Sequence, residues 1–309
     1  MAIRGILRPG EVCIRVMDKE KARRHYGEIM GLHEVLEEDD KLYFKCWDEW
    51  DHHSVVLRVT DRPGMDYLAF KVYSDADLDD LEAKLKGRDY EVEHIEAGVY
   101  PKSGRRIQFT LPTGHTMQFY AEKEQLGNTM GAHNPGVIPD DGVVRGVETP
   151  GLDHILLGGQ DIDACLELFT ELFDFDFVEQ LIDAESKMKL AVFLSCSNKP
   201  HDIAFVRQPE DNKFHHASFR LENAADVVKA ADRLGKYRVP IDVGPNRHGV
   251  TRGATIYFFD PSGNRNEVFA EGYVHYPDIP TLTWDTDELG AATFSQDFTP
   301  RQSFLEVLT

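Results

Sequence analysis

The sequence is poor in the features that mark secreted and membrane proteins. It has only four cysteines in 309 residues, and no two of them form a CxxC pair. Small secreted domains carry far more cysteine per residue, so reduced thiols are expected. The first residues, MAIRGILRPGEV, lack the long apolar core of a signal peptide. No apolar run approaches the roughly 20 residues of a membrane span. We therefore expect a cytoplasmic protein without a membrane partner.

Positive charge is also scarce. The chain has 34 Lys and Arg against 54 Asp and Glu, which gives a formal net charge of −20. This sign repels phosphate backbones, so nucleic acid is not an expected partner. A chain of 309 residues is long for one domain and comfortable for two, at roughly 100–200 residues each.

The chain repeats a pattern of strand, helix and several strands four times. The passes begin at VCIRV, YLAFKVY, DHILLGG and HHASFRL, and their expected helices span 19–31, 75–88, 161–173 and 224–236. The strands are short and rich in Val, Ile, Phe and Tyr, which indicates β-structure. The stretch GNTMGAHNPGVIPDDG is typical of a linker. We predict domains at 1–130 and 131–272. A tail at 273–309 is expected to pack on its own domain or on a neighbouring subunit.

The two halves can be matched to each other through three segments, which begin at Pro9-Gly10, AFKV and PTGHTMQFYAE in the first half. This comparison gives three pairs: His154 opposite Cys13, His216 opposite Tyr67, and Glu267 opposite Gln118. Two imidazoles and a carboxylate on one side of a metal form the facial triad of non-haem Fe(II) oxygenases. A lone histidine in an apolar strand is more often a core residue, but three metal-capable residues at matched positions favour a site. We therefore predict metal ligands in the second half and none in the first.

The run HGVTRGATIYFFDPSGNRNEVF, residues 248–269, is the most distinctive segment. Together with the preceding HHASFRL segment, it closely resembles the catechol 2,3-dioxygenases, which are type I extradiol dioxygenases. The resemblance spans the whole chain. It implies an α+β protein with the vicinal oxygen chelate (glyoxalase/extradiol dioxygenase) fold. In that fold, each of two domains contains paired βαβββ modules that form a half-open barrel.

The resemblance also implies a role for individual residues. His154, His216 and Glu267 match the ligands of Fe(II). His215 is expected on the other side of its strand, because side chains alternate along a strand. Mn(II) also accepts this ligand set, and Fe(II) is the metal that the resemblance favours.

Four further residues complete the expected site. His201 matches the acid–base histidine, and His248 and Tyr257 match groups that contact the catechol oxygens. Phe193 is expected to line an apolar wall for the ring. For His201 a water-exposed loop histidine remains the structural alternative, and for Tyr257 and Phe193 the alternative is core packing.

The implied reaction is extradiol (meta) ring cleavage of catechol or alkylcatechols with O₂ in aromatic compound degradation. The product is 2-hydroxymuconic semialdehyde. Fe(II) would chelate the catecholate and O₂, and a homotetramer is the implied assembly. Two alternatives share the fold: a glyoxalase-type isomerase that binds Zn or Ni, and a metal-free drug-binding protein.

Overall fold

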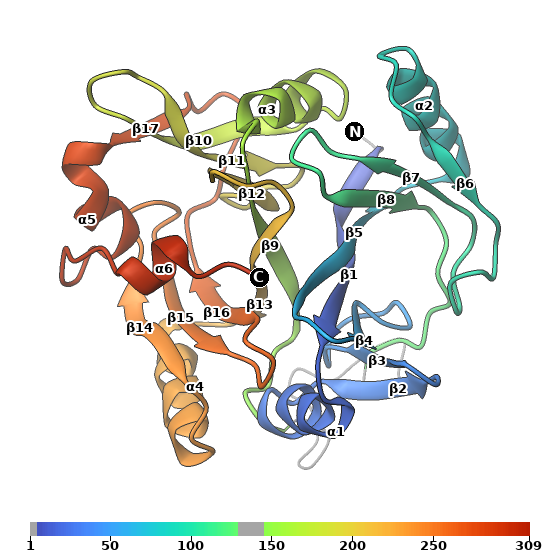
Figure 1. Ribbon diagram of the computed structural model, residues 1–309, viewed down its shortest axis with the longest axis horizontal. Coiled ribbons are helices and arrows are strands. Elements are labelled where there is room, and N and C mark those ends of the chain that lie inside the picture. Colours follow the sequence, from blue (N-terminus) through green and yellow to red (C-terminus); the bar gives the residue numbers. More distant parts are fainter. Residues whose placement is uncertain (1–4, 129–144) are drawn as a thin grey trace.

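The computed structural model describes residues 5–128 and 145–309. They form two halves that lie side by side, each built on a curved sheet with its helices on the outside (Figure 1). Most of the predicted linker, and the predicted domain boundary between residues 130 and 131, lie outside the described residues. Among the helices that the structure describes, none is long and apolar enough to cross a membrane.

The amino-terminal half contains two units that each begin with a long strand. The first unit comprises β1 (Ile6–Val16), α1 (Lys19–Arg23), the π-helical turn η1 (Arg24–Ile29), β2 (His33–Glu37), β3 (Lys41–Lys45) and β4 (Val55–Val59). The second comprises β5 (Gly64–Val72), α2 (Asp75–Lys86), β6 (Glu93–Ile95), β7 (Arg106–Thr110) and β8 (Thr116–Tyr120). Their strands form one sheet in the order β2-β3-β4-β1-β5-β8-β7-β6.

The carboxy-terminal half repeats this plan. Its first unit comprises β9 (Gly151–Gly159), α3 (Ile162–Glu171), β10 (Asp176–Ile182), β11 (Lys189–Ser195) and β12 (Ile203–Arg207). Its second comprises β13 (Lys213–Leu221), α4 (Ala224–Lys236), β14 (Ile241–Arg247), β15 (Gly253–Phe259) and β16 (Arg265–Glu271). The sheet order is β14-β15-β16-β13-β9-β12-β11-β10-β17, in which β17 (Leu282–Asp285) comes from the tail.

The pairing rules are the same in all four units. The first strand of each unit pairs in parallel with the last strand of that unit, as β9 does with β12 and β13 with β16. The two first strands of each half then pair antiparallel, β1 with β5 and β9 with β13. The predicted fold class, two halves of paired βαβββ modules, is confirmed.

The three long helices begin at side chains that cap their free backbone N–H groups. Ser74, Asp161 and Asn223 each accept a hydrogen bond from the backbone N–H three residues later. Such caps stabilise a helix by about 1 kcal/mol each. In α4, Val227 and Leu234 are buried against the sheet while the opposite face is polar, so packing orients the helix.

The tail turns back onto the carboxy-terminal half. After β17 it forms η2 (Thr286–Glu288), α5 (Leu289–Thr293) and α6 (Gln302–Glu306), drawn in red in Figure 1. The backbones of Thr309 and Phe214 exchange two hydrogen bonds of 2.8 and 3.0 Å. The Arg265 guanidinium donates to the carbonyl oxygens of Ser303 (2.9 Å) and Val307 (2.8 Å). The described tail therefore packs on the carboxy-terminal half.

Strand pairing corrects one of the three matches between the halves. Ala69 of β5 and Ser218 of β13 are matched positions of the two halves. Ser218 pairs with His154 of β9, whereas Ala69 pairs with Glu11 of β1, so Glu11 corresponds to His154. The predicted match of Cys13 with His154 is therefore wrong by two positions. The same shift occurs in both halves, between Pro9 and Glu11 and between Leu152 and His154, so Pro9 corresponds to Leu152 and not to Pro150.

Candidate metal centre

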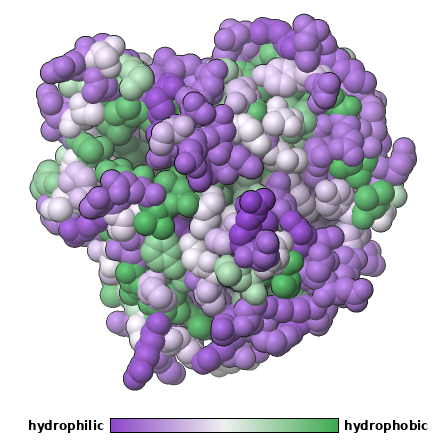
Figure 2. Space-filling view, viewed as in Figure 1, coloured by the Kyte–Doolittle hydropathy of each residue, from purple (hydrophilic) through white to green (hydrophobic). Residues whose placement is uncertain are grey.

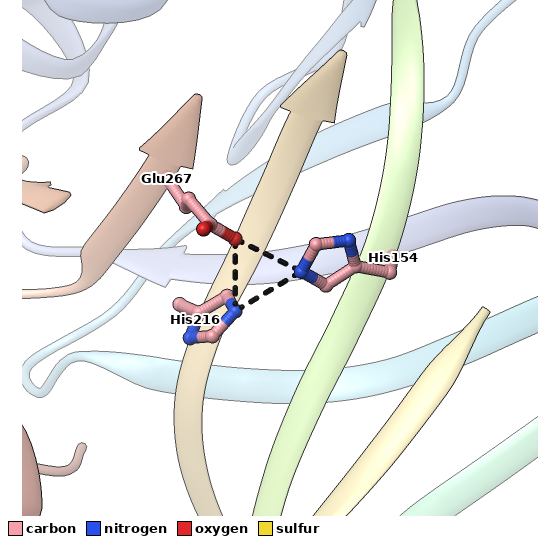
Figure 3. Close-up of side chains that lie close together, drawn as sticks. All are labelled: His154, His216 and Glu267. Carbon is pink, nitrogen blue, oxygen red and sulfur yellow. Dashed lines mark hydrogen bonds and ion pairs between the residues drawn. The ribbon is translucent and has the colours of Figure 1, made fainter. Parts of the chain in front are cut away.

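Three side chains converge where β9, β13 and β16 lie next to one another. His154, His216 and Glu267 come from these strands and are all buried (Figure 3). The two Nε2 atoms are 3.4 Å apart, and Glu267 Oε2 lies 2.9 Å from His154 Nε2 and 3.3 Å from His216 Nε2. Donor atoms about 2.1 Å from a divalent cation lie about 3 Å apart at neighbouring octahedral corners. The three distances therefore fit ligands on one face of a cation.

Hydrogen bonds fix which ring nitrogen of His154 and of His216 faces the cluster. His154 Nδ1 donates to Asp153 Oδ1 over 2.8 Å, which leaves its Nε2 toward the cluster. His215 Nε2 lies 2.9 Å from the Phe304 carbonyl oxygen and must donate to it, so His215 Nδ1 is an acceptor. His216 Nδ1 then donates to His215 Nδ1 over 2.7 Å, and His216 Nε2 keeps its lone pair. Such contacts orient metal-binding imidazoles and raise their basicity.

The expectation that His215 turns away from the site is wrong. The pairing of β13 with β9 shifts between Phe214 and His216, so His215 is the extra residue of a β-bulge. A bulge interrupts the regular alternation of side chains. His215 is consequently the partner that orients His216 instead of a residue on the opposite face.

Charge in the cluster follows from burial and close contacts. Burial opposes the charge of Glu267, but His154 and His216 hold the pKa of this carboxyl group well below its usual range. Burial also opposes a charged His154, but Glu267 and Asp153 raise its pKa to about 9. A cation that binds at His154 Nε2 must displace that proton. Burial lowers the pKa of His216 to about 4, so this imidazole is neutral at pH 7.

The side chains of His154, His216 and Glu267 line a cavity of about 310 Å³. This volume is at the lower end of the roughly 300–1,000 Å³ of small-molecule sites. Its apolar walls come from the sheet and from the tail: Leu156, Leu181, Leu190, Ala191, Phe193, Val206, Val250, Phe269, Leu289, Ala292, Phe304 and Leu305. On the face of the molecule that Figure 2 shows, hydrophobic residues gather mainly over the carboxy-terminal half.

Two of the predicted substrate-contacting residues form a pair at the wall of this cavity. His248 Nδ1 donates to the Thr293 carbonyl oxygen of α5. The Tyr257 hydroxyl lies 2.8 Å from His248 Nε2, within hydrogen-bond distance. His248 Nε2 is also 3.6 Å from Glu267 Oε1. The pair therefore places an imidazole and a hydroxyl next to Glu267.

The other two predicted residues pack beside His154. The ring centroids of His201 and His154 are 3.9 Å apart, and those of Phe193 and His201 are 5.4 Å apart with the two rings nearly perpendicular. His201 is buried, which excludes the water-exposed alternative, and its Nδ1 has no hydrogen-bond partner among the described residues. Burial lowers the pKa of His201 well below its ordinary value. The neutral imidazole of His201 thus lines the cavity.

Sequence reasoning missed several residues that hold this arrangement. Asp153 was not singled out, although an acidic residue directly before a candidate ligand histidine was a readable signal. Thr255, whose hydroxyl donates to Glu267 Oε1, lies two residues before Tyr257 in a strand with few polar residues. The tail residues Thr293 and Phe304, which accept from His248 and His215, gave no local signal at all.

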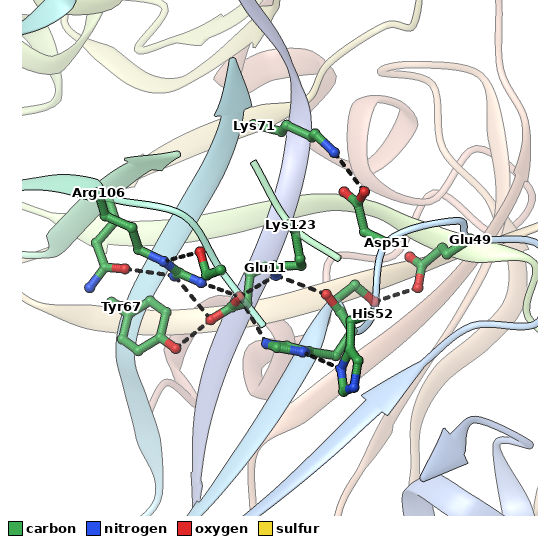
Figure 4. A network of polar contacts seen from close by, with 12 residues as sticks. Glu11, Glu49, Asp51, His52, Tyr67, Lys71, Arg106 and Lys123 are labelled. Carbon is green, nitrogen blue, oxygen red and sulfur yellow. Dashed lines mark hydrogen bonds and ion pairs between the residues drawn. The ribbon is translucent and has the colours of Figure 1, made fainter. Parts of the chain in front are cut away.

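The corresponding place in the amino-terminal half is filled by charged side chains of the protein (Figure 4). Glu11 is fully buried and accepts from Arg106 Nη2 at 2.8 Å, from the Lys123 ammonium and from the Tyr67 hydroxyl. Arg106 Nη1 also donates to Gln118 Oε1 over 2.9 Å. Burial acts against the charge of Glu11, but Arg106 and Lys123 hold the pKa of its carboxyl group well below its usual value. Two basic side chains therefore stand where the other half gathers two imidazoles and a carboxylate.

Known proteins resemble this chain over its whole length. Residues 65–124 match the catechol 2,3-dioxygenase-like N-terminal domain, and residues 151–268 match the glyoxalase/bleomycin resistance protein/dioxygenase superfamily. A metapyrocatechase from Pseudomonas sp. (strain CF600) is 44% identical over 99% of both chains. A manganese-dependent 2,3-dihydroxybiphenyl 1,2-dioxygenase from Geobacillus genomosp. 3 is 26% identical over 91% of this chain and 90% of its own length. The crystal structure of a 2,3-dioxygenase from Pseudomonas sp. KL28 is 41% identical, with a TM-score of 0.88 over 93% of this chain and 99% of that one.

Proposed function

Because this chain belongs to the catechol 2,3-dioxygenase family of extradiol dioxygenases, we propose that it opens the ring of catechol or alkylcatechols with O₂. Cleavage beside the diol gives a 2-hydroxymuconic semialdehyde, a step in the degradation of aromatic compounds. The observation that supports this assignment best is the convergence of His154 Nε2, His216 Nε2 and Glu267 Oε2 at one end of an apolar cavity.

We further propose Fe(II) as the metal. Two imidazole nitrogens and one carboxylate oxygen on one face leave other coordination positions open, as in the non-haem Fe(II) oxygenases. When bound, Fe(II) would hold catechol and O₂ together and let electrons pass from the ring to oxygen. The manganese-dependent relative matches 91% of this chain, so metal analysis, and not ligand type alone, identifies the ion.

The side chains around the metal ligands suit the handling of a diol. Tyr257 and His248, already joined by a hydrogen bond, would contact the substrate oxygens and orient the ring. His201 would take a proton from a substrate hydroxyl and return it later in the reaction. Its imidazole is neutral and its Nδ1 is free, which this role requires.

The walls favour uncharged ring substituents. Of the described residues that line the cavity, Arg207 is the only lysine or arginine. Its guanidinium is already used, because Nε donates to the Lys189 carbonyl oxygen over 2.8 Å and Nη2 contacts Asp163. A carboxylated catechol would lose water from its carboxylate without gaining a paired cation, which is costly. We therefore propose catechol and alkylcatechols as substrates, with carboxylated catechols disfavoured.

Oxygen uptake with a set of catechols tests the proposed reaction. Protein loaded anaerobically with Fe(II) should consume O₂ with catechol and 4-methylcatechol, form a yellow product, and react poorly with protocatechuate. Turnover without O₂ would favour the isomerase alternative, and protein without any bound metal would favour the binding protein.

Mass measurement in solution tests the proposed homotetramer, which has four times the chain mass of 35.1 kDa.

Substitutions test the residue roles. His216→Ala and Glu267→Ala should lose iron and activity together, because each removes a ligand atom. His201→Phe should keep its iron and lose a factor of about 10²–10⁴ in kcat, the usual contribution of acid–base catalysis. Full iron and turnover in His216→Ala would contradict the ligand assignment, and an unchanged kcat in His201→Phe would remove His201 from the mechanism.

A further inference from the structure

Lys199 joins two carboxylates that each lie next to a histidine of the site. Its Nζ is 2.9 Å from Asp202 Oδ1 and 3.5 Å from Asp153 Oδ1, and it also donates to the Asp153 carbonyl oxygen. Asp153 directly precedes His154, and Asp202 directly follows His201. We call Asp153, Lys199 and Asp202 the lysine clasp.

Asp202 is held firmly from its other side. Its Oδ2 accepts from the Cys196 backbone N–H at 2.9 Å and from the hydroxyls of Ser195 at 3.1 Å and Ser197 at 2.8 Å. Asp202 is fully buried, and its backbone N–H donates to the Leu194 carbonyl oxygen over 2.8 Å. The residue that follows His201 is thus fixed to the strand β11 and to the loop that ends it.

His201 has no comparable anchor of its own. No hydrogen bond from a described residue reaches its Nδ1, and its ring is located by packing against His154 and Phe193. Its position relative to the metal ligands therefore depends on the backbone at residues 201–202. Lys199 ties that backbone, through Asp202, to the residue that orients His154.

We propose that the lysine clasp positions His201 against His154, so that Lys199 is a positioning residue for the proton transfers of ring cleavage. This inference rests on the proposed role of His201. Burial acts against the charge of Lys199, but Asp153 and Asp202 raise the pKa of its ammonium group well above the ordinary value. The clasp therefore keeps its central charge throughout the working pH range.

The clasp also separates two spaces. His154 lines the metal-side cavity, whereas Asp153, Lys199 and Asp202 line a second cleft of about 650 Å³ between the two halves. Lys199 reaches the clasp from this second cleft, so a small amine added to the solution can reach the same position.

Kinetics of Lys199 variants test the proposal. Lys199→Met should keep its metal and its KM for catechol within about twofold, because the ligands and cavity walls are untouched. Its kcat should fall by about 10²-fold, the cost of misplacing a catalytic group by about 1 Å. Lys199→Arg, which keeps the charge, should recover most of the loss. Ethylammonium should partly restore kcat in Lys199→Ala, an effect that a purely structural role would not produce.

A double variant separates this inference from the proposed function. If Lys199 acts through His201, Lys199→Met should add no further loss of kcat in the His201→Phe background. A full additional loss there, or an unchanged kcat in Lys199→Met alone, would overturn the positioning role. An unchanged kcat in His201→Phe would instead overturn the proposed role of His201. If Lys199→Met does not fold, Lys199→Gln, which keeps hydrogen-bond donors without the charge, replaces it in the same comparison.

Discussion

Replacing Glu11 with alanine should strongly destabilise the amino-terminal half. The Glu11 carboxylate neutralises Arg106 and Lys123, and all three side chains are fully buried. Without the Glu11 carboxylate, the Arg106 and Lys123 side chains would remain buried and would lose the carboxylate that each contacts directly. Breaking a single buried ion pair by removing one partner costs about 3–5 kcal/mol. Because burial lowers the pKa of Lys123 to about 8, this side chain can lose its proton while Arg106 stays charged, so we expect a loss within that range.

Urea unfolding measures the effect. Far-UV circular dichroism reports on the sheets, and the fluorescence of Trp47 and Trp50 reports on the amino-terminal half in which they lie. With a denaturant slope of about 1–3 kcal/mol per molar urea, a loss of about 4 kcal/mol lowers the midpoint by more than 1 M. Glu20→Ala is the matched control, because the exposed pair of Glu20 with Arg23 should contribute little.

A compensated variant sharpens this prediction. Replacing Glu11, Arg106 and Lys123 together with methionine removes the charges and leaves no unpaired ion, so stability should return toward that of the parent protein. Equal urea midpoints for Glu11→Ala and the parent protein would refute the reasoning. They would mean that water reaches Arg106 and Lys123 when Glu11 is absent.

Three further perturbations have defined outcomes. Ala292→Phe should make the cavity smaller, so a substituted ring should fit less well than catechol. Oxygen-uptake kinetics should show that kcat/KM falls about 10-fold more for 4-ethylcatechol than for catechol. Gly249→Ala should displace α5, because the added Cβ would lie 2.3 Å from the Ala291 carbonyl oxygen. Thermal unfolding should show a free energy of unfolding that is lower by about 1–3 kcal/mol. Burial lowers the pKa of His53 to about 4 and that of His25 to about 3. The unfolded chain therefore binds more protons below about pH 6.5, and urea unfolding should show stability falling by about 3 kcal/mol per histidine as the pH drops to about 4.

The fold was predictable because its signals are local and repeated. Each of the four units places short apolar strands around a polar-faced helix, and the same order of elements recurs four times. The candidate metal cluster was predictable for a related reason. His216 and Glu267 occur at positions that match Tyr67 and Gln118 of the other half, and they lie with His154 in segments typical of strands.

What could not be predicted depends on single-residue shifts and on distant contacts. The bulge at His215 inserts a residue without leaving a pattern in the sequence, and it decides that His215 faces His216. The Pro-Gly pairs at Pro9 and Pro150 are alike in sequence but not in structural position, so they indicate Cys13 instead of Glu11 as the counterpart of His154. The contacts of the tail are equally invisible, because they join residues about 45 and 89 positions apart through backbone carbonyl oxygens.

The charged interior of the amino-terminal half bears on how preparations of this protein are standardised. A divalent ion approaching Glu11 meets a guanidinium and an ammonium already in place, so titration with metal should saturate at one equivalent per chain. Bound metal then counts working centres directly. Turnover divided by metal content should be constant between batches, however incompletely each batch was loaded.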